Sequence, residues 1–326
     1  METAILECLE GIELGEMEEF KNMAVFPLLT PEDEGPSYLT LKEALEAGVL
    51  SVTEVGQGGT VPELKVKNTG SACVLLLDGE ELAGAKQNRV LNATILLKGR
   101  SETIIPVSCT EAGRWSYVSP EFRDSDVVMS PRLRSRKSSS VAASLEHSEA
   151  FQSDQAEVWD GVAEMSQLAG APSPTAAMRD VFEARHRDLD EYLKAFGAVE
   201  GQKGLLVSIN GAVVALDVLS RGSAYGQLHA KLLKSYAMDA LLAPSENGAE
   251  PSLDKARAFI KEAAACEEKS YGSPGLGTDY RLRGPRIVGS ALVYEGAVIH
   301  AAFFRAEEGD QAGRISSYRQ RRGFRL

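Results

Sequence analysis

The chain has 326 residues, of which 44% are hydrophobic and 25% charged, and its formal net charge at pH 7 is −12. This composition is that of an ordinary soluble protein with one large or two medium cores, and no stretch approaches the roughly 18 apolar residues of a membrane-spanning helix. The acidic balance disfavours nucleic-acid binding, which depends on Lys and Arg side chains that neutralise phosphates.

The cysteines and the first residues of the chain indicate in which cellular compartment we expect the protein. Four widely spaced cysteines, without a Cys-x-x-Cys pair, are typical of isolated buried thiols rather than of a zinc or redox centre. The first ten residues carry acidic side chains where a signal peptide has basic ones. We therefore expect a cytoplasmic protein without a membrane partner.

The first half of the chain, residues 1–129, has the pattern of short strands separated by turns. Apolar residues at 23–26 predict an early strand, and Thr40 and Gly48 are placed to begin and end a short helix. Further strand-like runs, with turns rich in Gly and Asn between them, lie at residues 49–55, 64–67, 73–77, 89–97 and 103–107. Many short strands at this spacing predict an antiparallel, sandwich-like domain.

The second half, residues 130–326, changes to helical periodicity. Ser130-Pro131 predicts a helix start, Ser153 is placed to cap a second helix over 154–168, and a third is expected over 173–196. A hairpin is expected over 205–216, followed by helices over 225–242 and 252–264. A strand over 278–283 and a second hairpin over 287–304 complete the predicted elements. The predicted fold is α+β, with helices packed on a second antiparallel sheet; whether it is one domain or two is left open.

Although the chain has a negative net charge, its basic residues form two local runs. One consists of Arg132, Arg134, Arg136 and Lys137, and the other of Arg314, Arg319, Arg321, Arg322 and Arg325. Charged runs are usually solvated faces. We expect both runs to be exposed.

A first polar segment follows the strand at 73–77. It holds two adjacent carboxylates and a group of cations and amides, namely Glu80, Glu81, Lys86, Gln87, Asn88 and Arg89. If a turn brings the acids near the cations, a carboxylate can act as a base or hold a metal ion while the cations hold an anion. The alternative is a hairpin whose polar groups satisfy its own backbone.

A second polar segment ends the strand at 103–107. Cys109 is a candidate nucleophile, Glu111 and Arg114 are candidate ligand contacts, and Trp115 is a candidate stacking wall. The alternatives are an inert core cysteine, since all four histidines are distant in sequence, and an internal pair of Glu111 with Arg114. These alternatives stay open.

Several familiar motifs do not occur in the sequence. There is no phosphate-binding Gly-x-x-x-x-Gly-Lys motif, no Gly-x-Gly-x-x-Gly between a strand and a helix, and no Gly-x-Ser-x-Gly elbow. With four scattered histidines, a multi-histidine metal site is not expected, whereas Mg²⁺ held by carboxylates is not excluded. The cofactor is otherwise unknown.

Four segments together resemble a known family. They are Val-Phe-Pro-Leu from 25, Asp-Gly-Glu-Glu-Leu-x-Gly-Ala-Lys-Gln-Asn-Arg from 78, Asn-Ala-Thr-Ile-Leu-Leu from 92 and Ile-Pro-Val-Ser-Cys-Thr-Glu-Ala-Gly-Arg-Trp from 105. They resemble the bacterial and archaeal family named the ARG and rhodanese-phosphatase-superfamily-associated protein domain. The resemblance implies association with ADP-ribosylglycohydrolase-like and rhodanese-phosphatase-like domains, and so nucleotide- or ADP-ribose-linked metabolism or a bacterial defence or stress pathway. It supplies no catalytic residue.

The residues and the resemblance together predict a small-molecule-binding protein, with hydrolysis of a nucleotide-derived, ADP-ribose-like or phosphorylated compound as the leading reaction. The expected catalytic residues are Glu80, Glu81, Glu111 and Cys109; the expected ligand-binding residues are Lys86, Gln87, Asn88, Arg89, Arg114 and Trp115. The alternative is a non-catalytic module that recognises a partner protein through the run at 132–137 or the C-terminal arginines. The oligomeric state is left open.

Overall fold

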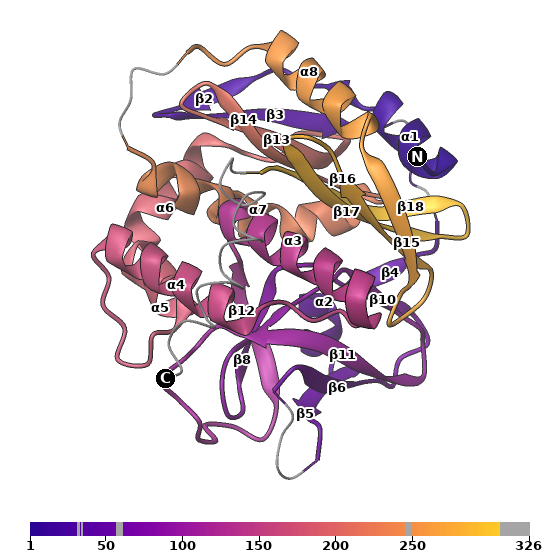
Figure 1. The fold of residues 1–326 in the computed structure, drawn as a ribbon, viewed down its shortest axis with the longest axis vertical. Helices are drawn as coiled ribbons and strands as arrows, with labels where there is room; N and C mark the ends of the chain where they lie inside the picture. The colour runs from indigo at the N-terminus through magenta and orange to yellow at the C-terminus, as the bar shows by residue number, and fades with distance from the viewer. Residues whose placement is uncertain (31–32, 34, 57–60, 245–248, 307–326) are drawn as a thin grey trace, which may run out of the picture.

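The computed structural model describes residues 1–30, 33, 35–56, 61–244 and 249–306. Its largest element is a nine-stranded antiparallel sheet, whose strands come from both ends of the chain (Figure 1). The order across the sheet is β1 (Glu13–Leu14), β3 (Met23–Leu29), β13 (Gln202–Ile209), β14 (Ala212–Leu219), β18 (Ala297–Arg305), β17 (Ile287–Tyr294), β16 (Thr278–Arg283) and β15 (Glu267–Gly272), with β2 (Glu18–Phe20) also paired to β3. The predicted α+β fold is confirmed.

Both predicted hairpins are present in this sheet. Asn210 and Gly211 take positive φ angles of 49° and 73° between β13 and β14, and Glu295 and Gly296 take 52° and 80° between β17 and β18. Two consecutive positive φ angles are the signature of a type I′ turn, whose twist matches that of the flanking strands. A side chain at Gly211 would also meet the backbone oxygen of Ala249, so glycine is required there.

The early strand β3 pairs with β13 rather than with the other strands of the first half. Phe26 lies opposite Leu206, and Val25 opposite Val207. Strand pairing therefore crosses the boundary expected near residue 129. A division into two domains stays a prediction.

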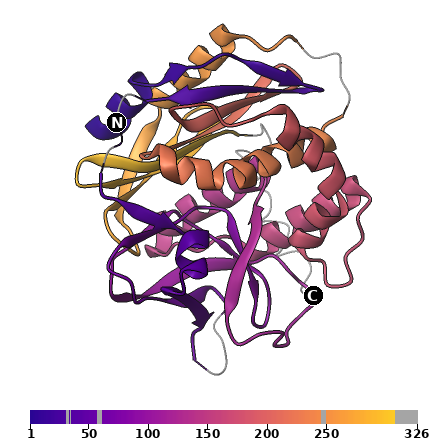
Figure 2. The ribbon, with the colours of Figure 1, turned by 180° about the vertical axis from the view of Figure 1, so that it is seen from behind.

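Helices cover both faces of the large sheet (Figures 1 and 2). On one face α1 (Thr3–Glu10) and α8 (Leu253–Ala264) share a core with alternate strand residues, such as Phe259 with Leu206. On the other face a second group of helices shares a core with Leu205 and Val207. These helices are α3 (Pro131–Ser148), α4 (Gln155–Ala169), α5 (Met178–Ala184), α6 (His186–Ala195) and α7 (Gly222–Leu242). Because helices cover both faces of the sheet, every residue of β13 is buried.

Two details of the helices correct the sequence predictions. The side chain of Asp154, not Ser153, caps α4 by accepting from the backbone N–H groups of Ala156 and Glu157, while the Ser153 hydroxyl contacts Ser108. The helix expected over 173–196 is two helices, because the backbone breaks at Arg185, where φ is −104° and ψ is 12°.

The remaining strands form a smaller β module beneath the helices. A six-stranded sheet runs β12 (Phe122–Val128), β8 (Glu80–Gly84), β9 (Arg89–Leu91), β11 (Ser101–Cys109), β6 (Glu63–Asn68) and β5 (Leu50–Glu54). A three-stranded sheet runs β10 (Ile95–Leu97), β7 (Cys73–Leu76) and β4 (Tyr38–Thr40). With α2 (Leu41–Glu46), these sheets enclose a core of their own. Thr40 and Glu43 form the capping box of α2, as the sequence predicts for Thr40.

This β module departs from the predicted strands in two ways. The run at 89–97 is not one strand: β9 and β10 belong to different sheets, and between them Asn92 and Thr94 turn their side chains to Phe151 O and His300. The pairing of β4 with β7 is parallel, whereas only antiparallel pairs were expected.

The basic run at 132–137 is not a solvated face, which corrects the prediction. Arg134 is fully buried and donates to both carboxylate oxygens of Asp217, at 2.8 and 2.9 Å. Lys137 is also buried and contacts Asp78 and the carbonyl oxygen of Leu91. Only Arg132 and Arg136 lie nearer the surface, where both pair with Glu164. The C-terminal arginine run lies outside the described residues.

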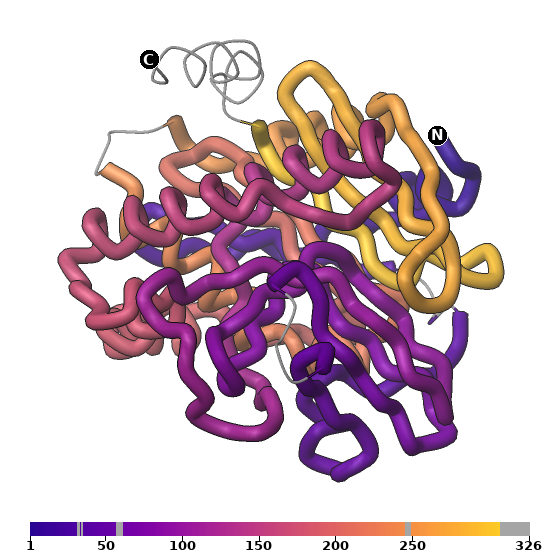
Figure 3. Tube along the Cα trace, turned by 60° about the horizontal axis from the view of Figure 1, so that its bottom comes forward, coloured from indigo at the N-terminus to yellow at the C-terminus, as the bar shows by residue number. Residues whose placement is uncertain are grey.

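These buried charges connect the two parts of the fold. Asp78 belongs to the β module and Asp217 to β14, and Arg134 of α3 pairs with both. The helix lies between the β module and the strands of the large sheet (Figure 3). Asp217 also accepts from the hydroxyl of Tyr236 at 2.6 Å and lies 3.0 Å from His300 Nε2. Burial would raise the pKa of Asp217, but Arg134 and His300 hold it well below its usual range. The network is therefore an ionised and hydrogen-bonded core.

Candidate functional site

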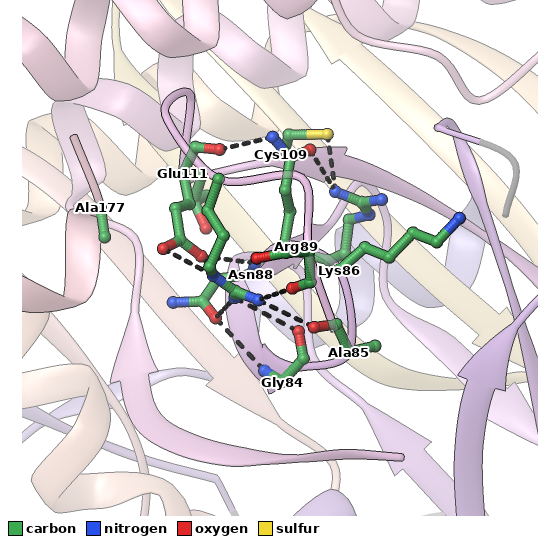
Figure 4. A network of polar contacts seen from close by, with 12 residues as sticks. Gly84, Ala85, Lys86, Asn88, Arg89, Cys109, Glu111 and Ala177 are labelled. Carbon is green, nitrogen blue, oxygen red and sulfur yellow. Dashed lines mark hydrogen bonds and ion pairs between the residues drawn. The ribbon is translucent and has the colours of Figure 1, made fainter. Parts of the chain in front are cut away.

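The two polar segments of the sequence meet in space (Figure 4). Because β9 pairs with β11, Arg89 lies opposite Cys109, and the turn before β9 lies against the loop after β11. Across this junction the Asn88 N–H donates to Glu111 Oε2 at 3.1 Å, and Gln87 Nε2 donates to the carbonyl oxygen of Glu111 at 2.8 Å. Six predicted site residues from the two segments therefore form one cluster; they are Gln87, Asn88, Arg89, Cys109, Glu111 and Arg114.

Arg114 holds the centre of this cluster together. It donates to both oxygens of Glu111, at 2.9 and 2.6 Å, and to the backbone oxygen of Ala85 at 2.8 Å. Burial would raise the pKa of Glu111, but the bonds from Arg114 and Asn88 lower it below its ordinary value. The internal Glu111–Arg114 pair, one of the alternatives from the sequence, is thus present.

Arg89 forms the floor of the cluster and is fully buried. Its Nη1 donates to Gln87 Oε1 at 2.9 Å and to Cys109 Sγ at 2.8 Å, and its Nη2 lies 3.7 Å from Glu54 Oε1. Burial raises the pKa of the Cys109 thiol in spite of the neighbouring Arg89. A thiol with a raised pKa is a poor nucleophile at neutral pH.

Some donors and acceptors of this floor are unused. Within the described part of the chain, Arg89 Nε, Arg89 Nη2 and Glu54 Oε2 are buried without a hydrogen-bond partner. Arg89 Nη2 and Glu54 Oε1 form an ion pair, but their separation of 3.7 Å is too long for a hydrogen bond. Buried polar groups in folded proteins almost always find a partner, so this pair is set to bond with water or with a ligand.

An aromatic and cationic rim lies above the floor. The ammonium of Lys86 lies 5.2 Å from the ring centroids of both Trp115 and Tyr117, and the guanidinium of Arg89 lies 5.7 Å from the Trp115 ring. The Trp115 and Tyr117 side chains are 51% and 53% exposed. An open groove of about 850 Å³ runs beside this rim; its lining includes Thr53, Glu54, Lys65 and residues 117–120.

Glu80 and Glu81 lie apart from the cluster and from each other, because neighbouring strand residues point to opposite faces. Glu80 accepts from Lys231 Nζ at 2.9 Å, and the same Nζ lies 2.6 Å from Asp124. Glu81 accepts from the Thr110 hydroxyl at 2.6 Å, and burial raises its pKa to about 7. The catalytic roles expected for both residues stay predictions.

Two members of the site were missed by the sequence reasoning. Glu54 is buried at the end of β5, whose residues alternate between buried and half-buried positions. A glutamate at an inward position of an alternating strand is unusual, and that pattern was a usable signal. Tyr117 had no comparable signal, because its position depends on the course of the loop after Arg114.

The site shows no arrangement typical of a metal centre. Among the described residues, no three His, Cys, Asp or Glu side chains are grouped so that they could hold a metal ion. In the same ranges, no helix is long and apolar enough to cross a membrane.

Comparison with known proteins gives one result. Neither the curated proteins nor the solved structures contain a match to this chain. A family model does match, over residues 11–304, and this range includes the whole β module and every residue of the cluster and its rim. The chain therefore belongs to the family described as the ARG and Rhodanese-Phosphatase-superfamily-associated Protein domain.

Proposed function

We propose that this protein binds and hydrolyses a small nucleotide-derived or ADP-ribose-like molecule in the groove beside Glu54. The observation that carries the proposal is the buried Arg89–Glu54 pair: Glu54 lines the open groove and has an unused acceptor, and Arg89, 3.7 Å behind it, has unused donors. The proposal includes a cytoplasmic, bacterial setting; none of the four cysteines, all of which lie among the described residues, forms a disulfide, which fits the cytoplasmic part.

The chemistry of the site matches three parts of such a ligand. The ammonium of Lys86 suits a phosphate, and the exposed rings of Trp115 and Tyr117 suit a planar base. The unused N–H groups of Arg89 and the free oxygen of Glu54 offer donors and an acceptor together, as a ribose hydroxyl requires. A simple anion would use only the cations.

Hydrolysis is assigned to Glu54, which lines the groove, rather than to Glu80 or Glu111. Its carboxylate would take a proton from a water that attacks a phosphoryl group of the ligand, and would return that proton to the ribose or phosphate oxygen that leaves as the P–O bond breaks. Glu111 is committed to Arg114, and Glu80 is committed to Lys231. Under this proposal a Glu54→Gln variant retains binding of ADP-ribose or AMP and loses its turnover.

Titration calorimetry with ADP-ribose, AMP and ribose 5-phosphate tests the binding step. We expect Lys86→Met to weaken binding of these compounds about ten-fold, because it removes one charged contact to phosphate while the thioether still packs on the rings. Lys67→Met is the matched control: it removes the same charge from β6, where Lys67 is exposed and pairs with Glu102. The proposal fails if none of the compounds binds the wild type, or if the two variants bind equally.

A second candidate function, recognition of a partner protein, is favoured by the exposed Trp115, Tyr117 and Val118. The run at 132–137 does not supply such a surface, because Arg134 and Lys137 are buried. Partner recognition predicts no binding of any of the three small compounds, so the same titration separates the two functions.

A further inference from the structure

The loop that carries Trp115 and Tyr117 is fixed to the turn that carries Lys86. Arg114 donates to the backbone oxygens of Ala85 and Ser116, at 2.8 and 2.9 Å. The Val118 N–H donates to Ala85 O at 3.0 Å, and the Ala85 N–H donates to the Ser119 hydroxyl at 3.0 Å. These bonds lie on both sides of the aromatic residues. The two rings are therefore held at a defined place although half of each is exposed.

Trp115 and Tyr117 border the same ammonium group. Both ring centroids lie 5.2 Å from the Lys86 ammonium, so the two centroids are at most twice that distance apart. A flat ring that enters between two others needs about 7–8 Å between the outer pair, since carbon atoms pack at roughly 3.5–4.0 Å, and this upper limit allows that separation. The ammonium of Lys86 lies against both rings, where cation–π attraction holds it.

We propose that Trp115 and Tyr117 clamp the planar base of the ligand, and that Lys86 moves from the rings to the ligand phosphate. This inference rests on the proposed function and deepens it, since it makes Tyr117 the residue that selects a base-bearing ligand over a sugar phosphate. In this exchange the ammonium leaves the rings for the phosphate, and the base takes over the contact with the rings.

Tryptophan fluorescence reports the clamp directly. The chain has two tryptophans, so a Trp159→Phe background leaves Trp115 as the single reporter. We expect AMP to quench this signal and to bind more tightly than ribose 5-phosphate. Tyr117→Ala should weaken AMP about ten-fold, as loss of one base–aromatic stack does, and should leave ribose 5-phosphate unchanged. Tyr117→Phe, which keeps the ring, should bind AMP like the parent.

The outcomes separate the clamp from the proposed function. If ribose 5-phosphate binds as tightly as AMP and Tyr117→Ala affects neither, the clamp is wrong while binding in the groove stands. If neither compound binds the parent protein, both are wrong. Because Tyr117 is 53% exposed, its truncation removes little core packing, and a thermal melt of each variant checks that it is folded.

Discussion

Replacing Arg134 with methionine is expected to lower the free energy of unfolding by about 3–5 kcal/mol. The guanidinium makes two hydrogen bonds to Asp217, and both side chains are fully buried. Methionine would leave Asp217 ionised or force it to take up a proton, with only Tyr236 and His300 still bonded to it. Removing one partner of a buried ion pair lowers the free energy of unfolding by more than the net contribution of the pair, because the remaining charge is then buried without an opposite charge beside it. Urea unfolding at neutral pH measures the change.

Arg132→Met is the control for this substitution. Arg132 lies in the same helix, but its pair with Glu164 is at the surface, where the two side chains are 37% and 40% exposed. Exposed pairs contribute about 0–1 kcal/mol. If the two variants lose equal stability, the buried network does not connect the β module to the large sheet as described.

Glu81→Gln is expected to stabilise the protein at alkaline pH and to have little effect in acid. The folded state raises the pKa of Glu81 to about 7, chiefly by burial, from an unfolded value of about 4.3. The neutral form is thus favoured in the fold, so the stability that Glu81 contributes is present below the unfolded pKa and is lost as pH rises through the folded pKa. Glutamine keeps an oxygen for the Thr110 hydroxyl and never ionises.

The difference in unfolding free energy between Glu81→Gln and the wild type should therefore grow by about 3 kcal/mol from about pH 4.5 to about pH 8. Chemical unfolding of both proteins across this range measures it, and other titrating groups cancel in the difference. A difference that stays constant with pH would show that Glu81 is not the buried neutral acid described here.

Local sequence signals were sufficient where structure is local. The Asn210-Gly211 turn, the Pro131 helix start and the Thr40 capping box each depend on residues within one turn of each other, and all three are present. The predictions that failed concern distant partners. The strand at 89–97 divides because Thr94 turns toward His300, which is 206 residues away.

The burial of Arg134 and Lys137 illustrates the same point. Lys137 lies on the buried side of α3 with Val141, whereas the run of basic residues favoured a solvated face. Only the acids that α3 contacts make such burial favourable: Asp78, from the turn before β8, and Asp217, from β14 of the large sheet. The spacing of residues along the sequence does not show that α3 contacts these two acids.

The candidate site was predicted in part. Cys109, Arg89 and Glu111 could be expected together because neighbouring strands carry them, and they do lie together. The divergence of Glu80 and Glu81 follows from strand alternation, and it was missed because no strand was predicted over residues 80–84. Glu54 and Tyr117 reach the site through sheet pairing and loop course, which short-range patterns do not encode.

A crystal structure of the wild-type protein with ADP-ribose would show where the ligand binds. We expect the ligand in the groove beside Glu54, with its base between Trp115 and Tyr117 and the Lys86 ammonium on a phosphate. A second groove, of about 630 Å³, is lined by Leu133, Met165 and Leu242. ADP-ribose bound there, or anywhere that leaves Glu54 and Arg89 untouched, would show that the proposed site is wrong.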